Sequence, residues 1–163
     1  MSASELATGP DATPYERIKA LGLVLPAAPS PIANFVTHVR EGNFLFLSGQ
    51  GPTEAGGVIH TGKVGAEVSI ESAYAHARLT GLNLIAVMHE ALGDLARVGR
   101  IVKLFGMVNA TPDFADHPSV INGCSDLLIA VFGQRGIHAR SAVGFGSLPN
   151  RITVEIEAIV AIA

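Results

Sequence analysis

The chain has few residues that could cross-link a fold or anchor it in a membrane. Its single cysteine, Cys124, excludes an intrachain disulfide and a cysteine-based zinc site, as is usual in a reducing compartment. No run of about 18 apolar residues occurs, and the start MSASELATGPDATPYER lacks the basic and apolar regions of a signal peptide. We therefore expect a soluble, cytoplasmic protein without a membrane partner.

Charged residues are also scarce. They make up 15% of the chain beside 48% hydrophobic residues, whereas about 25% is usual. The net charge is -3, and the 11 lysines and arginines form no basic stripe, which argues against nucleic acid as a partner. So much apolar surface predicts an oligomer in which neighbouring subunits cover an apolar face.

Hydrophobic periodicity predicts a disordered tail at residues 1–12 and a single domain at residues 13–163, of which residues 13–32 form an N-terminal extension. The extension has a short helix capped by Thr13, followed by an extended connector. The predicted elements are a hairpin at 35–40 and 43–48, a helix at 69–92, a strand at 99–110, a helix at 117–132 and strands at 139–145 and 152–162, with a further short strand at 58–59.

This order, ββαβαββ, predicts an α/β (α+β) fold with a mixed sheet and two long helices on one face. The other face of the sheet then needs cover, in agreement with the expected oligomer. Gly81 interrupts the first long helix, and we expect another backbone to pack closely against it.

Arg140 is the first candidate functional residue. A guanidinium on a strand between Ala139 and Ala142 is costly to desolvate unless a carboxylate or phosphate meets it. Its planar fork suits a bidentate carboxylate, so a small organic acid is a natural ligand. The alternatives are a structural ion pair with Glu155 or Glu157, or an arginine that reaches solvent at the strand end.

Glu155 and Glu157 lie two residues apart on one strand and point to the same side. Either carboxylate could act as a proton shuttle or a water-positioning base in dry surroundings. Such a pair is otherwise the solvated face of an edge strand, and the register with Arg140 stays open.

Other motifs favour structural roles. The six histidines show no metal-binding spacing, so no metal site is expected. Cys124 falls on the apolar face of the second long helix, which predicts a buried, inert thiol. The glycine-rich SGQGP ends an early strand, and its exposed backbone N–H groups could line a ligand site.

Three segments resemble the YjgF/YER057c/UK114 family, also called the RidA or reactive-intermediate deaminase family. They are LSGQGP after the hairpin, ING in the second long helix, and ARSAVGFGSLPNRITVEIEAI near the end. The resemblance covers residues 33–161. It implies a chorismate-mutase-like fold and a homotrimer with clefts between subunits. It also implies hydrolysis of small enamines or imines, of the 2-iminobutanoate and 2-iminopropanoate type, to 2-keto acids and ammonia without a cofactor or metal.

The resemblance also implies roles for individual residues. Arg140 matches the arginine that clamps the substrate carboxylate, and Glu155 matches the glutamate that handles the attacking water. The residues implied to line the substrate site are Phe35, Ser48, Gly49, Gln50, Asn122 and Ala142.

This sequence departs from the family pattern at several places. Phe35 replaces a tyrosine and Ala142 a cysteine, so a phenolic hydroxyl and a thiol are lost. The N-terminal extension and a longer loop after Pro52 also suggest a divergent branch. The alternative function is therefore a non-catalytic trimer that binds small carboxylates such as 2-keto acids, and a ribonuclease or translation inhibitor is less favoured.

Overall fold

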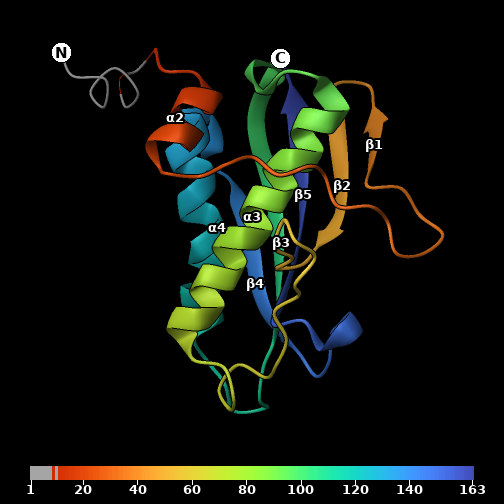
Figure 1. Cartoon of the computed structure of the whole chain (residues 1–163), viewed down its shortest axis with the longest axis vertical. Coiled ribbons are helices and arrows are strands. Elements are labelled where there is room, and N and C mark those ends of the chain that lie inside the picture. The colour runs from red at the N-terminus through yellow and green to blue at the C-terminus, as the bar shows by residue number, and fades with distance from the viewer. Residues whose placement is uncertain (1–8, 10) are drawn as a thin grey trace.

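The protein is a five-stranded mixed β-sheet with two long helices packed on one face, as Figure 1 shows for a computed structural model that describes residues 9 and 11–163. The sheet order is β1-β2-β5-β3-β4, with β3 and β4 parallel and the other pairs antiparallel. The elements are α2 (Pro14–Ala20), β1 (His38–Glu41), β2 (Phe44–Gln50), α3 (Ile70–Leu92), η1 (Leu95–Arg97), β3 (Val98–Asn109), α4 (His117–Phe132), η2 (Gly133–Gly136), β4 (Ala139–Phe145), η3 (Pro149–Arg151) and β5 (Val154–Ile162).

This architecture confirms the predicted fold class, and the strands and long helices follow the expected chain order. The predicted tail at residues 1–12 lies largely outside the described residues. None of the helices in the described part of the chain is long and apolar enough to cross a membrane.

Local signals account for the helix boundaries. Ser69 caps α3 by accepting a hydrogen bond from the Ser72 amide, and Gly93 ends this helix in the left-handed conformation at φ 76°. Thr13 and Glu16 form a reciprocal capping box at the start of α2. The short helix expected from the sequence is therefore present, with Pro14 in its first turn.

The hydrophobic core lies between the helices and one face of the sheet. In β5 the side chains of Val154, Ile156, Ala158 and Val160 are buried, whereas Glu155 and Glu157 point to the opposite face. Cys124 is fully buried in this core, and burial raises the pKa of its thiol to about 12. A thiol with this pKa stays protonated at neutral pH and is a poor nucleophile.

The second face of the sheet is exposed and rich in apolar side chains. Val39, Phe46 and Ile159 lie in one cross-strand row on this face, and Phe46 is 44% exposed. Further along the same face, Met107 is the cross-strand partner of Glu155, and Val143 lies beyond it on β4. This open face is the apolar surface that the composition predicted.

The N-terminal extension crosses the helical layer before it joins the sheet. In Figure 1 the chain leaves α2, passes over α3 and loops out beside β2 before β1 begins. The Tyr15 hydroxyl contacts Nδ1 of His89 on α3 at 2.9 Å and accepts a hydrogen bond from the Leu95 amide at 2.9 Å. These contacts fix the start of the extension against the end of α3.

Three expected strand segments differ from the structure. The first strand of the hairpin begins at His38 instead of Phe35. Val58 and Ile59 form no strand, because Ile59 makes only an isolated bridge to Thr53. The last strand begins at Val154 instead of Ile152, because Asn150 and Arg151 have positive φ values of 54° and 57°. Backbone in that region cannot continue a β-ladder.

Candidate active site

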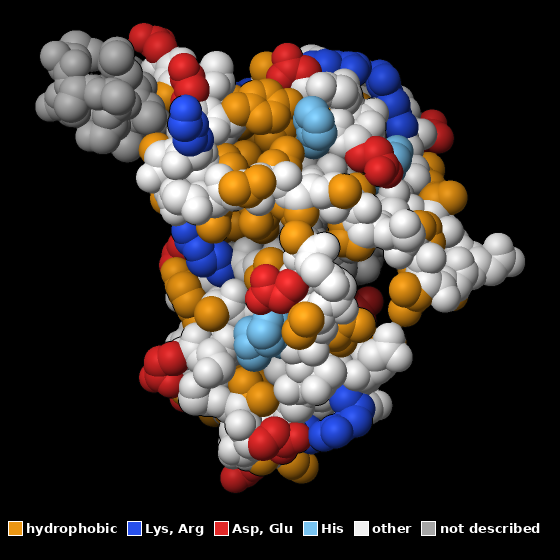
Figure 2. Space-filling view, viewed as in Figure 1, with side chains coloured by type: hydrophobic (Ala, Val, Ile, Leu, Met, Phe, Trp, Pro, Cys, Tyr) orange, Lys and Arg blue, Asp and Glu red, His pale blue; other side chains and the backbone are white. Residues whose placement is uncertain are grey.

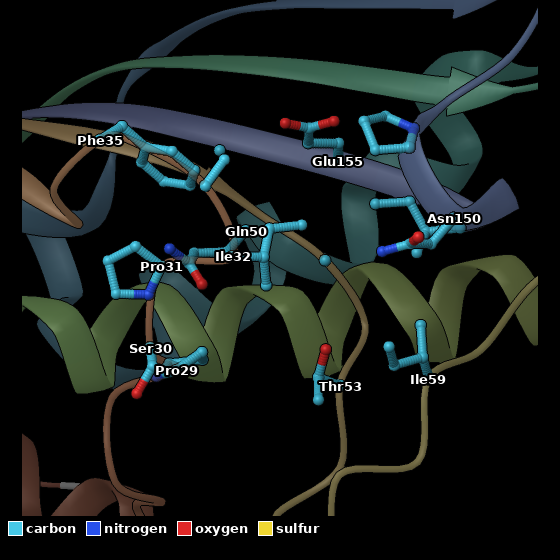
Figure 3. Close-up of a pocket in the computed structure, with 15 residues that line it drawn as sticks. Pro29, Ser30, Pro31, Ile32, Phe35, Gln50, Thr53, Ile59, Asn150 and Glu155 are labelled. Atoms are coloured by element: carbon cyan, nitrogen blue, oxygen red, sulfur yellow. The ribbon is translucent and has the colours of Figure 1, made fainter.

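A cavity of about 340 Å³ lies where β2 ends beside the start of β5. Its walls include four residues implied by the family resemblance, Phe35, Gly49, Gln50 and Glu155. Figure 3 shows Phe35 and Glu155 next to the sheet, with Thr53 and Ile59 on the far side of the cavity. In Figure 2 the surface is hollowed between the projecting segment that leads to β1 and the β4–β5 loop.

An irregularity in β2 makes room for the Glu155 side chain. The register of β2 against β5 shifts between Leu47 and Gln50, which is the signature of a β-bulge. A Cβ atom at Gly49 would overlap Oε1 of Glu155. The carboxylate therefore lies over the Gly49 backbone, in space that any other residue would fill.

The surroundings of Glu155 favour its protonated form. Burial, and secondarily the negative charge of Glu157, raises the pKa of the Glu155 carboxyl above its ordinary value. Carboxyl groups that exchange protons with a substrate are commonly half-buried and have a raised pKa.

Gln50 is 7% exposed and lies on the wall of the same cavity. The backbone just after it is held by Asn83 of α3, whose Nδ2 donates to the carbonyl oxygens of Gly51 and Thr53, each at 3.0 Å. Asn83 therefore fixes the backbone of this wall of the cavity. Ser48 lies outside the cavity lining, and its hydroxyl donates to the Val36 carbonyl at 2.6 Å.

Arg140 lies on a different face of the sheet from Glu155. It is the cross-strand partner of Leu104, which in turn pairs with Ala158, and both of these side chains are buried under the helices. Glu155 projects from the open face, so the two side chains diverge. Among the described residues, Arg140 forms no ion pair with Glu155 or Glu157. The alternative prediction of a structural ion pair between Arg140 and Glu155 or Glu157 is therefore wrong within one subunit.

Hydrogen bonds to α4 orient the Arg140 guanidinium. Nη1 donates to the Ser125 hydroxyl at 3.0 Å, and Nη2 donates to the Pro118 carbonyl at 3.2 Å. Ser125 also contacts Nε2 of His138 at 2.9 Å. Burial, with a further contribution from the positive charge of Arg140, lowers the pKa of His138.

Asn122 and Ala142 belong to the Arg140 side of the molecule. Asn122 is exposed on α4. Ala142 shares the helix-facing side of β4 with Arg140 and packs against the core. The predicted site residues therefore form two groups within one subunit, one around Glu155 and one around Arg140.

A second cavity of about 450 Å³ lies near the Arg140 group. Lys63 and His117 line it, together with Phe145 at the end of β4. His117 precedes Pro118, which accepts the hydrogen bond from Arg140. Lys63 Nζ donates to Asn109 Oδ1 at 3.0 Å and to the Gly146 carbonyl. Glu155 is not among the residues that line this second cavity.

Sequence reasoning missed several residues of the first cavity. Residues 29–32 of the N-terminal extension and the adjoining Ala33 line it, as does Asn150 of the β4–β5 loop. From the sequence, the segment of the extension was predicted only as an extended connector, and Asn150 only as part of a turn. The proline-rich run PAAPSP was a signal for a stiff segment, but nothing in it indicated which surface that segment contacts.

Comparison with known proteins identifies the family. Residues 15–154 match the model of the family described as "YjgF/chorismate_mutase-like, putative endoribonuclease". The match runs from α2 to the first residue of β5 and includes Gly49. The chain belongs to the YjgF/RidA family.

Two curated relatives cover most of this chain. Protein TCP17 of Trypanosoma cruzi is 44% identical over 88% of this chain and 90% of that protein. The 2-iminobutanoate/2-iminopropanoate deaminase of Escherichia coli (strain K12) is 34% identical over 81% of this chain and 90% of that enzyme.

Solved structures agree with the fold. The protein Atu1372 of Agrobacterium tumefaciens, whose function is described as unknown, has a TM-score of 0.85 at 42% identity, covering 99% of this chain and 95% of that one. Escherichia coli TdcF with bound serine has a TM-score of 0.60 at 26% identity, covering 83% and 94% of the two chains.

Proposed function

We propose that this protein hydrolyses small 2-imino acids to 2-keto acids and ammonia. The observation that carries the proposal is the half-buried Glu155 carboxylate in a cavity that also holds Phe35, Gly49 and Gln50. Relatives named 2-iminobutanoate/2-iminopropanoate deaminase support the reaction type. The bound serine of TdcF supports a ligand of amino-acid size.

The proposed working unit is a homotrimer with its sites between subunits. Arg140 and Glu155 project from opposite faces of one sheet, so a site that uses both takes them from two copies of the chain. The exposed apolar residues of the open face, such as Phe46 and Val143, offer the surface that copies would bury. In this arrangement the Arg140 guanidinium of one subunit binds the substrate carboxylate beside Glu155 of the next.

The proposed reaction needs one water and no further reactant. Glu155 takes a proton from water as the water oxygen bonds to the iminium carbon, which gives a carbinolamine. Glu155 then gives this proton to the nitrogen and takes the hydroxyl proton of the carbinolamine as the C–N bond breaks, so that ammonia leaves and the carbonyl of the 2-keto acid forms. Because the iminium carbon is already electrophilic, the site mainly positions substrate and water.

The second candidate function is a carboxylate-binding trimer without turnover. Phe35 and Ala142 stand where the archetypal branch has a tyrosine and a cysteine, which removes two groups able to take part in chemistry. Protein TCP17, at 44% identity, also has a name that specifies no activity. Ribonuclease activity is less favoured, because the net charge is -3 and the 11 lysines and arginines form no basic stripe along the sequence that would bind a phosphate backbone.

Hydrolysis is tested by adding the purified protein to an imine made in situ from an amino acid by an amino-acid oxidase with catalase. We expect faster release of ammonia and 2-keto acid, with kcat/KM lowered about 100-fold or more in Glu155→Gln and in Arg140→Ala. Glu71→Gln and Lys19→Ala, both on exposed helix residues outside the two groups and away from the open face of the sheet, serve as matched controls. Binding of 2-keto acids without acceleration of any imine would instead support the carboxylate-binding trimer.

A further inference from the structure

The walls of the Glu155 cavity that face away from the sheet come from the parts of the chain that depart from the family pattern. Residues 29–32 belong to the N-terminal extension, and Thr53 and Ile59 belong to the long loop after Pro52. Figure 3 shows Ile32 and Pro31 between Phe35 and this loop. These segments therefore determine the shape of the space beyond Glu155.

The lining of this space is mostly apolar. Ile32, Phe35 and Ile59 all line the cavity, with exposed fractions of 74%, 44% and 43%. Among the lining residues, Glu155 is the one ionisable side chain. Apolar side chains that stay in contact with water around a cavity favour a ligand that displaces the water.

The cavity is also larger than the smallest 2-imino acids need. At about 340 Å³ it falls within the usual range for sites that enclose whole organic ligands. The methyl group of 2-iminopropanoate would leave the side chains of Ile32 and Ile59 in contact with water. A branched or aromatic side chain would cover them.

We propose that the Glu155 cavity is the side-chain pocket of the substrate site and selects 2-imino acids with bulky apolar side chains, such as those derived from leucine or phenylalanine. This inference rests on the proposed deaminase function. Ile32 and Ile59 are the specificity-determining residues, because both come from the divergent segments and face the space beyond Glu155.

The test compares kcat/KM for the imines of leucine and alanine, each generated by an amino-acid oxidase with catalase. We expect a leucine-to-alanine ratio of about 10 or more, since a single methylene in a hydrophobic pocket changes kcat/KM by about tenfold or more. The ratio should fall severalfold in Ile32→Ala. It should stay at the wild-type value in Val24→Ala, a control in the same extension but outside the cavity. Hydrolysis with a ratio of one or less would overturn the selectivity while leaving the deaminase intact.

Binding gives a second readout that does not depend on turnover. Calorimetry with 4-methyl-2-oxopentanoate and with pyruvate should show about tenfold tighter binding of the larger keto acid, and Ile32→Ala should reduce this difference. Equal affinity for the two keto acids would overturn the pocket assignment. Failure to hydrolyse any imine would overturn the deaminase function. The comparison of the two keto acids would still show whether the Glu155 cavity binds bulky apolar side chains.

Discussion

Glu155 reaches the cavity only because the residue beneath it has no side chain. Its Oε1 lies so close to the Gly49 backbone that a Cβ atom at this position would overlap it. The bulge in β2 supplies the irregular backbone at this point. The acidic group of the proposed mechanism is thus oriented by a glycine on the neighbouring strand, which makes Gly49 a positioning residue.

Gly49→Ala should displace the Glu155 carboxylate and leave the fold intact. The overlapping atoms belong to the end of a flexible side chain, and Gly49 does not have a positive φ. We expect kcat/KM for imine hydrolysis to fall about tenfold or more, with the melting temperature close to wild type. Gly56→Ala is the control, because a Cβ there meets open space. Full activity in Gly49→Ala would mean that the position of Glu155 does not matter.

The raised pKa of Glu155 predicts the acid limb of the pH profile. A carboxyl with a raised pKa keeps its proton to a higher pH, and the proposed base works only when ionised. Activity should therefore rise with pH through a midpoint above the ordinary glutamate pKa of about 4.3. The measurement is kcat/KM from pH 4 to pH 8 after subtraction of spontaneous hydrolysis. An identical limb in Glu155→Gln would assign the titration to another group.

Among the elements, the contact between α3 and α4 depends on small residues. A Cβ atom at Gly123 would overlap the carbonyl oxygen of Tyr74, so the two helix backbones touch there. Gly81 of α3 faces Cys124 of α4, and a Cβ atom at Gly81 would lie 3.3 Å from the Cα atom of Cys124. The expectation that a backbone packs closely against Gly81 is therefore confirmed. This close approach positions α4, which holds the Arg140 guanidinium through Ser125.

Gly123→Ala should destabilise the protein by forcing the helices apart. Overpacking of this kind costs about 1–3 kcal/mol, and backbone atoms cannot move aside as a flexible side chain can. The free energy of unfolding from urea titration is the measurement. Ser119→Ala, on an exposed residue of the same helix, should change it by less than about 0.5 kcal/mol. A Gly123→Ala protein as stable as wild type would show that α4 can shift freely.

At the scale of the whole molecule, the sheet is covered on one side only. The helices bury one face, and the other presents Val39, Phe44, Phe46, Val143 and Phe145, each at least 37% exposed. This surplus of apolar surface agrees with the low charged fraction of the sequence. It is the physical argument for the proposed trimer, since isolated exposed apolar residues are common but a whole apolar sheet face is not.

Phe46→Lys should therefore prevent assembly. We expect light scattering to give a trimer for the wild-type protein and a smaller species for this variant at micromolar concentration. Because the proposed site takes Arg140 and Glu155 from different copies, imine hydrolysis should be lost together with the trimer. Val24→Lys, at a residue 85% exposed outside the sheet, should remain trimeric and active. A wild-type monomer would overturn the site between subunits.

The sequence by itself determined the elements whose signals are local. The predicted ranges 117–132 and 139–145 coincide with α4 and β4, because apolar periodicity, Pro118 and Gly133 all lie within or next to these segments. Gly49, Gln50 and Glu155 were also found from the sequence, through two family motifs, LSGQGP and ARSAVGFGSLPNRITVEIEAI, each of which is continuous along the chain.

Only the tertiary structure decided which residues share a face and a cavity. Arg140 and Glu155 are separated by β3, and a change of one residue in register would have placed them on the same side of the sheet. Residues 29–32 reach the Glu155 cavity because the extension passes over α3, which brings together segments far apart in sequence. Such placements depend on packing between distant segments, which neither local periodicity nor residue spacing encodes.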